Sequence, residues 1–397
     1  MSVSTIGSSE NHDLIIKHIP KKTLTQQLWE ARGSYAMLLP FFIPFIIFGV
    51  FPMVASLYLA FTDYAGSRNR PFEFVGFENF TELISLEIKH TPRLLDDETR
   101  AVLFQCGRSR VLLEEVAEQE ADGRVCEPAY MNPREVLSDG FRMSTLLLPS
   151  DEGAYVLGAK DPRFWTAMNN TVRYVGVTVT ASVLLGLGLA LALQQQSTLN
   201  MVLRVVFFLP SVTSAVAITV VWGHLFRGAS YGFINSIRLN LGFEVIEFLA
   251  DPTWILPIVM ILSIWGGMGY NMILFLAGLQ SIPQDMYEAA TVDGATTFEK
   301  FRFITLPLLR PTTIFIVVTS IIGSFQVFDA VYILYASTGG AVGGVLDSAL
   351  TIVSYLYELG FRNSQMGYAS AIAWVLFVII FVFTMINLRV SRANEVY

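Results

Sequence analysis

Six long apolar segments constrain the fold of this chain more than any other feature of its sequence. They lie at residues 34–62, 166–193, 203–226, 253–279, 308–335 and 366–388. Each contains at least eighteen consecutive residues without Asp, Glu, Lys or Arg, close to the roughly 20 residues that a helix needs to cross a bilayer. Membrane β-strands are much shorter, which excludes a barrel. We therefore predict an all-α polytopic membrane protein with six transmembrane helices.

The net charge of the chain lies in one segment between the first two apolar runs. Charged residues make up only 15% of the chain, whereas soluble domains have about 25%. The net charge is −7, and residues 63–163, with 19 acidic and 12 basic side chains, account for all of it. This pattern indicates membrane lipid as a partner and gives no sign of nucleic acid.

The distribution of Lys and Arg predicts the orientation of the helices. If the N-terminus is inside, the inside segments contain Lys17, Lys21, Lys22, Arg32, Arg204, Lys300, Arg302, Arg310, Arg389 and Arg392, and the short outside loops contain Arg227, Arg238 and Arg362. Because positive charge favours the cytoplasmic side, both termini are predicted to be cytoplasmic. The first apolar run is too long for a signal peptide and lacks a small-residue cleavage site, so we expect it to stay in the membrane.

These predictions divide the chain into consecutive regions. They are a cytoplasmic N-terminal segment (1–33), transmembrane helix 1 (34–62), an extracytoplasmic insertion (63–163), the remaining five-helix core (164–391) and a cytoplasmic tail (392–397). For the N-terminal segment, a short helix on the inner membrane surface and a disordered tail are both open.

A polar segment at residues 281–311 separates two of the apolar runs. Ser281 followed by Gln284 has the form of a capping box, which predicts the start of a helix. Gly294 ends that helix, and Thr296 or Thr297 is placed to cap a second one. The segment is therefore predicted to form a helix, a glycine turn and a helix outside the membrane.

The residues of this segment resemble the EAA loop of permease subunits in ATP-binding-cassette importers, in particular the carbohydrate branch. The matching positions are Glu288, Ala289, Ala290, Gly294, Ile304, Leu306 and Pro307. Tyr287 and Asp293 around them resemble the carbohydrate branch. The resemblance includes the larger membrane subunit of maltose importers and permeases of the glycerol-phosphate and trehalose type. It implies that residues 281–307 couple the chain to a separate ATPase and that the protein lies in a bacterial or archaeal cell (inner) membrane.

The same resemblance implies partners and a class of solute. The expected partners are a second permease, an ATPase dimer and an extracytoplasmic solute-binding protein, and the expected solute is a di- or oligosaccharide or a glycerol phosphate. The chain has no Gly-x-x-x-x-Gly-Lys-[Ser/Thr] phosphate loop. We therefore expect no cofactor in this chain, with ATP and Mg²⁺ bound by the ATPase.

The outside segment 63–163 is an insertion relative to that family. Residues 74–80 and 161–165 resemble permease segments that normally lie close together, but here about 75 residues separate Leu83 from Lys160. Residues 109–120 have helical character. The position and acidity of the insertion suggest a docking surface for the binding protein.

Both cysteines of the chain, Cys106 and Cys126, fall in this insertion. On the oxidising side of the membrane they are placed to form a disulfide that closes a loop of about 20 residues, worth roughly 3 kcal/mol in the chain-entropy model. Two free thiols are the alternative. We expect no metal site, because His90 is the only histidine in the insertion.

Polar residues within the spans are the candidates for contact with the solute, because a polar group in hydrocarbon needs a partner. The helix at 253–279 offers Gly267, Tyr270 and Asn271, and a small-residue packing seam is the alternative. The helix at 308–335 offers Gln326, Asp329 and Tyr332, which are three residues apart and on one face. Their alternative role is in the structure of the helix bundle.

Two other classes of function are weighed against an importer permease. An ion-coupled secondary transporter needs ion sites, yet Asp329 is the only acidic residue deep in a span. An intramembrane enzyme needs a catalytic pair, and the spans contain no such arrangement. We therefore expect a transport subunit rather than an enzyme.

Overall fold

The computed structural model describes residues 29, 32–67, 71–96, 99–149, 153–336 and 342–392. It forms two compact units, Met1–Ala55 and Ser56–Tyr397. The first contains α2 (Arg32–Phe45), the π-helical segment Ile46–Val50 and the start of α3 (Phe51–Leu59). Residues Met37–Leu59 are long and apolar enough to cross a membrane. Most of the N-terminal segment and the tail after residue 392 lie outside the described residues.

The second unit contains the other long apolar helices. They are α7 (Pro162–Ala192), α11 (Pro252–Gln280), α15 (Arg310–Phe325) with α16 (Asp329–Ala336), and α18 (Met366–Arg392). Within the described residues, five helices are long and apolar enough to span a membrane, or six if one bent pair counts as a span. The prediction of a helical membrane protein is confirmed, and its six spans are obtained when the bent pair is counted as one span.

The bent pair corrects the prediction of one helix over residues 203–226. Helix α8 (Thr198–Val212) and helix α9 (Ala215–Leu225) meet at an angle of 97°. Thr213 between them is extended, and its hydroxyl donates to the carbonyl of Leu209. Pro210 has no N–H to donate, and hydroxyl bonds of this kind compete with the helical ladder, so the helix ends here despite its apolar sequence.

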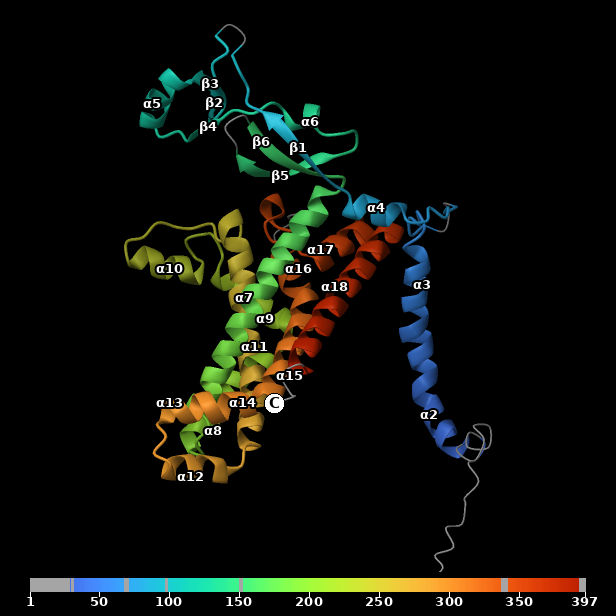
Figure 1. The fold of residues 1–397 in the computed structure, drawn as a ribbon, viewed down its shortest axis with the longest axis vertical. Helices are drawn as coiled ribbons and strands as arrows, with labels where there is room; N and C mark the ends of the chain where they lie inside the picture. Colours follow the sequence, from blue (N-terminus) through green and yellow to red (C-terminus); the bar gives the residue numbers. More distant parts are fainter. Residues whose placement is uncertain are drawn as a thin grey trace, which may run out of the picture. The chain divides into compact units, whose positions relative to one another are not determined.

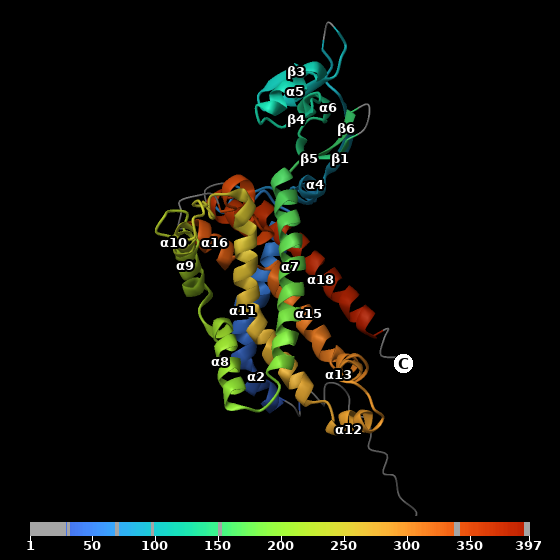
Figure 2. The same ribbon diagram turned by 90° about the vertical axis from the view of Figure 1, so that its left-hand side faces the viewer.

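Helices α7 and α11 lie side by side along their length, as Figures 1 and 2 show. The close approach depends on Gly186 of α7, because a Cβ atom there would lie 2.7 Å from the Cβ of Asn271. Ala190, one turn further along, is also buried, whereas Gly188 points away from this contact. Small residues four apart thus build the seam between the two helices.

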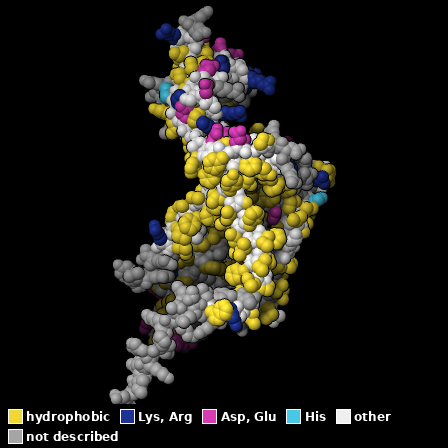
Figure 3. All heavy atoms as spheres, turned by 90° about the vertical axis from the view of Figure 1, so that its right-hand side faces the viewer, with side chains coloured by type: hydrophobic (Ala, Val, Ile, Leu, Met, Phe, Trp, Pro, Cys, Tyr) yellow, Lys and Arg dark blue, Asp and Glu magenta, His cyan; other side chains and the backbone are white. Residues whose placement is uncertain are grey.

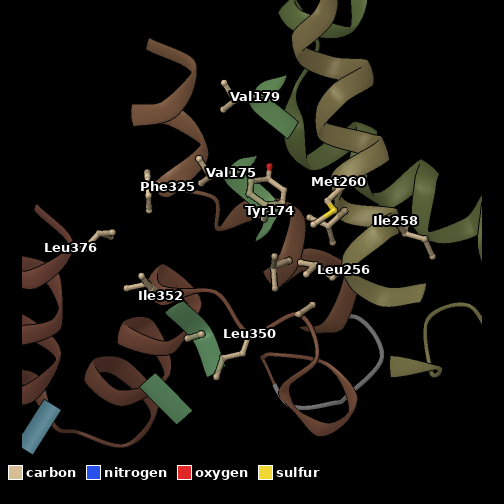
Figure 4. Packing of buried hydrophobic residues seen from close by; sticks show 14 of the residues in the cluster. Tyr174, Val175, Val179, Leu256, Ile258, Met260, Phe325, Leu350, Ile352 and Leu376 are labelled. Carbon is tan, nitrogen blue, oxygen red and sulfur yellow. The ribbon is translucent and has the colours of Figure 1, made fainter. Parts of the chain in front are cut away.

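The buried core combines side chains from all the long helices of the second unit (Figure 4). Its members include Tyr174, Val175, Val179, Leu256, Ile258, Met260, Phe325, Leu350, Ile352 and Leu376. Outside this core, the helices keep large apolar side chains exposed, such as Leu184, Val205 and Phe381. Figure 3 shows the helical surface covered by hydrophobic side chains and the charged side chains gathered mainly at the insertion, as a membrane protein requires.

The insertion contains strands that the sequence analysis did not predict. Its elements are α4 (Glu78–Ile84), β1 (Leu86–Pro92), β2 (Leu103–Cys106), β3 (Ser109–Leu112), α5 (Leu113–Ala121), β4 (Cys126–Pro128), α6 (Pro133–Val136), β5 (Arg142–Pro149) and β6 (Gly153–Ala159). They form two antiparallel sheets, ordered β1-β6-β5 and β3-β2-β4.

The predicted helix over residues 109–120 is correct only from Leu113. Residues Ser109–Leu112 pair with β2 across a two-residue turn whose first residue, Gly107, has φ +63°. A positive φ at that position favours a tight hairpin. This pairing removes the first four residues from the helix.

Candidate functional site

The polar segment after α11 forms the predicted helix, glycine turn and helix. Helix α12 (Gln284–Val292) is followed by Gly294, which has φ +81°, and then by α13 (Thr297–Lys300). Thr296 and Glu299 form a capping box at the start of α13, and these hydrogen bonds hold the pKa of Glu299 below its usual value. A π-helical segment (Phe301–Thr305) and α14 (Leu306–Leu308) then lead back toward α15.

The capping box expected at Ser281 is wrong. Ser281 instead ends α11, and its hydroxyl donates to the carbonyl of Gly278 at 2.7 Å. Pro283 is the N-cap of α12 and makes no side-chain cap hydrogen bond. Helix α11 continues to Gln280, so Ser281 caps the C-terminus of α11 and not the N-terminus of α12.

Two hydrogen bonds brace α12 against the segment that follows it. The hydroxyl of Tyr287 lies 2.9 Å from that of buried Thr305, and the ammonium of Lys300 donates to Thr291 at 2.8 Å. Behind this brace is a cavity of about 780 Å³ between the ends of α7 and α11, lined in part by Gln194 and Gln280. The helix pair is therefore held as a unit across the end of the bundle.

The outer surface of this helix pair is exposed. Glu288, Ala289, Asp293, Gly294 and Pro307 are exposed, and Ala290 and Leu306 are half-buried. Within the described residues, the Glu288 carboxylate has no hydrogen bond or ion pair. Val292 and Phe298 are also exposed, by 88% and 72%. We call the segment from Gln284 to Leu308 the coupling loop, after the role that its sequence leads us to expect.

A second cavity, of about 290 Å³, lies between α7, α11 and α15. Its lining residues are Tyr174, Thr178, Ser182, Ser263, Gly267, Tyr270, Asn271, Thr319, Ser320, Gly323, Ser324 and Val327. Among these described residues none is charged. Six of them are Ser or Thr, and a seventh, Tyr174, carries a buried hydroxyl. We call this space the hydroxyl cavity.

Helix α7 contributes a face that the sequence analysis did not single out. Tyr174, Thr178 and Ser182 are four residues apart and line the hydroxyl cavity together. The Thr178 hydroxyl donates to the carbonyl of Tyr174 at 2.6 Å, as the Ser263 hydroxyl does to that of Val259 at 2.9 Å. Each oxygen keeps its lone pairs as acceptors. The four-residue spacing places the three residues on one face of α7, but only the packing of α7 against α11 brings that face to a cavity.

Three of the predicted solute contacts, Gly267, Tyr270 and Asn271, line this cavity. The Asn271 side chain is 4% exposed, and within the described residues its amide has no hydrogen-bond partner. Because Asn271 lines the cavity, its amide can form hydrogen bonds with a polar ligand there.

The other three predicted contacts, Gln326, Asp329 and Tyr332, do not line it, which corrects the expectation that they share a helical face. Helix α15 ends at Phe325 with Gln326 as its C-cap, and α16 begins at Asp329. Asp329 is exposed in the first turn of α16, where the helix dipole stabilises a carboxylate. Tyr332 packs in an aromatic cluster beyond the break.

An ionic cluster lies at the end of α7 opposite the coupling loop (Figure 1). The Arg163 guanidinium donates two hydrogen bonds of 2.8 Å to Asp347 and two of 3.1 Å to Glu358. This cluster ties α7 to the π-helical segment Glu358–Arg362 that follows α17 (Ile352–Tyr357). A forked guanidinium holds both carboxylates in a fixed geometry.

Asp161 adds a second set of bonds beside this cluster. Its carboxylate accepts hydrogen bonds from the hydroxyls of Tyr355 and Tyr368, the shortest being 2.8 Å in each case, and caps α7 through the Phe164 N–H. Burial and the Asp161 charge raise the pKa of Tyr355, so its hydroxyl remains a donor. The sequence analysis gave residues 161–165 no such structural role.

In the insertion, Cys106 and Cys126 form a disulfide that joins β2 to β4. The two cysteines face each other in the strand register. Over the described part of the chain, no cluster of three His, Cys, Asp or Glu residues is placed to hold a metal ion.

An apolar helical bundle with a hydroxyl cavity inside it and a braced helix pair across one end defines a multi-pass membrane permease. Residues 182–395 match the family model described as "Binding-protein-dependent transport system inner membrane component". The chain belongs to this family, so it is a permease subunit of an ATP-binding-cassette importer. Its relatives are transport permeases rather than enzymes.

Relatives of the chain are also named as permease proteins of transport systems. The chain is 35% identical over 233 residues to the arabinooligosaccharides transport system permease protein AraP of Bacillus subtilis, covering 58% of this chain and 72% of the relative. It is 35% identical to the lactose transport system permease protein LacF of Rhizobium radiobacter, covering 59% and 78%. It is 36% identical to the trehalose/maltose transport system permease protein MalF of Thermococcus litoralis, covering 60% and 77%.

A solved structure shares the fold over nearly the whole chain. It belongs to a bacterial ABC transporter involved in the import of the acidic polysaccharide alginate. The TM-score is 0.65 at 22% identity, and the match covers 94% of this chain and 99% of the other. At that identity the likeness supports the fold and not the solute.

Proposed function

We propose that this chain imports an uncharged saccharide through the hydroxyl cavity. The observation that carries the proposal is the composition of the lining, which offers hydroxyls and one unpartnered amide and, among the described residues, no charge. A saccharide loses its hydration on entering the membrane, so each of its hydroxyl groups needs a new partner. An anionic glycerol phosphate would need a positive partner that this lining does not supply.

The half-exposed ring of Tyr270 fits this class of solute. Its exposed fraction is 48%, and it lies beside the Asn271 amide in the cavity lining. Sugars present apolar C–H faces and polar edges, so a ring and an amide side by side suit them. The names of the relatives, which refer to arabinooligosaccharides, lactose and trehalose/maltose, support the same class.

The coupling loop is proposed to transmit ATP hydrolysis to the bundle. Its exposed surface combines the Glu288 carboxylate with the apolar side chains of Val292 and Phe298, which suits a cleft on a separate ATPase. ATP and Mg²⁺ would be bound by that ATPase. The brace between Tyr287 and Thr305 would pass a movement of α12 to the helices.

The proposed complete transporter contains two permeases, an ATPase dimer and an extracytoplasmic solute-binding protein. The excess of Lys and Arg on one side supports cytoplasmic termini in a bacterial or archaeal inner membrane. The region boundaries at residues 33, 62, 163 and 391 are part of this proposal. The exposed position of Asp329 gives no support to an ion-coupled transporter, which would need a buried ion site.

Removing polar groups from the hydroxyl cavity should weaken transport. Thr178→Val and Asn271→Leu each remove hydrogen bonds worth about 0.5–1.5 kcal/mol apiece. We expect saccharide uptake by the reconstituted transporter to fall by roughly three- to tenfold per substitution. The measurement is the initial rate of uptake of radiolabelled maltose, lactose or arabinotriose into proteoliposomes.

The matched control is Thr219→Val in α9. Thr219 is buried and donates to the carbonyl of Ala215 at 2.7 Å, much as Thr178 donates to Tyr174, but it does not line the cavity. Its uptake should equal that of the wild type. Equal losses in Thr178→Val and Thr219→Val would mean that the effect reports helix structure and not the solute.

A further inference from the structure

Four aromatic rings form a continuous cluster just beyond the hydroxyl cavity. Phe328 stacks on Tyr332 at 5.1 Å between ring centroids and lies 5.0 Å from Tyr357, which in turn stacks on Phe361 at 5.2 Å. The Arg362 guanidinium lies 5.8 Å from the centre of the Tyr332 ring. We call Phe328, Tyr332, Tyr357, Phe361 and Arg362 the aromatic shelf.

The shelf combines exposed ring surface with polar edges. Phe361 is 65% exposed, and Phe328, Tyr332 and Tyr357 are half-buried. The rings of Tyr332 and Tyr357 meet edge to face, with 5.2 Å between their centroids. Aromatic rings with hydroxyls at their edges and a guanidinium beside them offer both stacking and hydrogen bonds to one ligand.

The shelf begins one residue after the last residue that lines the hydroxyl cavity. Val327 lines the cavity and Phe328 begins the shelf, in the break between α15 and α16. The Val327 carbonyl accepts a hydrogen bond of 3.1 Å from Thr351, which fixes this junction.

The second half of the shelf is held rigidly by the ionic cluster. Arg163 binds Glu358 through two hydrogen bonds of 3.1 Å, and Glu358 begins the π-helical segment that ends at Arg362. Tyr357 immediately precedes this segment. A binding surface that is fixed before the ligand arrives loses less entropy on binding.

We propose that the aromatic shelf is a saccharide-binding site that receives an uncharged sugar before it enters the hydroxyl cavity. The sugar would lay a C–H face on the exposed rings, and Arg362 and the two tyrosine hydroxyls would hydrogen-bond its hydroxyl groups. The proposal rests on the proposed function, because it takes the same solute class. It assigns to Tyr332 a contact outside the cavity.

The test compares Phe361→Ala with Phe233→Ala in the complete reconstituted transporter. Phe233 is 59% exposed in α10 (Phe233–Asn240) and does not belong to the shelf. The sugar used is the one of maltose, lactose and arabinotriose that the wild type transports. We expect Phe361→Ala to lower the maximal uptake rate of this sugar by about three- to tenfold, because one ring contact is lost. Phe233→Ala should transport at the wild-type rate.

A direct measurement separates binding from transport. In saturation-transfer NMR on the purified complex without its binding protein, protons of the same sugar should receive magnetisation from aromatic protons. This transfer should decrease in Phe361→Ala and in Tyr357→Ala. Tyr332→Phe, which keeps the ring and removes only the hydroxyl, should retain the transfer and show a smaller loss of uptake.

The outcomes distinguish failure of this proposal from failure of the proposed function. If the wild type transports a saccharide and Phe361→Ala is unchanged in uptake and transfer, the shelf is not a sugar site. If Phe361→Ala instead lowers the yield of assembled complex on size exclusion, or changes uptake only with lipid composition, the shelf covers a second permease or contacts lipid, and the proposal is overturned. If the wild type transports no saccharide but imports another solute, the proposed function fails first.

Discussion

Replacing Gly294 by valine should abolish most of the stimulation of ATP hydrolysis by solute. Gly294 has φ +81°, between α12 and α13 of the coupling loop. That conformation costs an L-residue about 1–2 kcal/mol, and more for a β-branched one. The two helices should therefore reorient and misplace the coupling loop. We expect stimulated hydrolysis to fall by about tenfold or more, which corresponds to an increase of about 1.4 kcal/mol in the activation free energy.

A matched control for this substitution exists at the opposite end of the helices. Gly242 has φ +83°, and at both glycines no described heavy atom lies within 4 Å of the position of an added Cβ. Gly242→Val thus imposes the same backbone strain in the turn after α10. It should leave stimulated ATP hydrolysis near the wild-type value, and a similar loss in both variants would refute a special role for the coupling loop.

Replacing Gly269 by alanine should destabilise the bundle itself. A Cβ at Gly269 would overlap the backbone carbonyl oxygen of Phe207 in α8, so one of the two helices must move. Overpacking of this kind costs roughly 1–3 kcal/mol, which exceeds the gain of up to about 1 kcal/mol from replacing a helical glycine by alanine. We expect a lower midpoint of thermal unfolding for the purified subunit or complex.

Gly266→Ala, three residues earlier in α11, is the control. Among the described atoms nothing lies within 4 Å of a Cβ at that position, so only the gain in helix propensity remains. Its unfolding midpoint should equal or slightly exceed that of the wild type. If both alanine variants unfold alike, the contact between Gly269 and Phe207 does not hold α8 and α11 together.

The sequence predicts the membrane helices well because a bilayer sets their length and apolar character directly. It does not predict where such a helix breaks. The bend between α8 and α9 and the break at Gln326 both lie in apolar runs, where local hydrogen bonds such as that of Thr213 to Leu209 decide the path. Because the helix breaks at Gln326, Asp329 and Tyr332 do not lie on the helical face where the sequence analysis placed them.

The candidate site is predicted only where the residue types are unusual. Gly267, Tyr270 and Asn271 form a conspicuous cluster in one helix, and they line the hydroxyl cavity. Thr178 and Ser182 do not stand out in a sequence, because Ser and Thr are common in membrane helices, where their hydroxyls bond to their own backbone. Only the packing of α7 against α11 brings them to the same cavity.

The sheets of the insertion depend on contacts between distant parts of the chain. Strand β1 pairs with β6 in a register that joins Leu86 to Ala159. No local pattern specifies that partner, since strand pairing is decided by which faces become buried together. A disulfide between Cys106 and Cys126, in contrast, is an expectation that the sequence itself supports, because no other cysteine is present.

The most direct test of this account is the ATP hydrolysis of the complete wild-type transporter in proteoliposomes with different solutes. The complex contains this chain, its partner permease, its ATPase and its binding protein, and the solutes are maltose, lactose, arabinotriose and glycerol 3-phosphate. We predict that at least one uncharged saccharide stimulates hydrolysis and is accumulated, and that glycerol 3-phosphate does neither. Stimulation by glycerol 3-phosphate alone, or saccharide uptake driven by an ion gradient without ATP, would contradict the account.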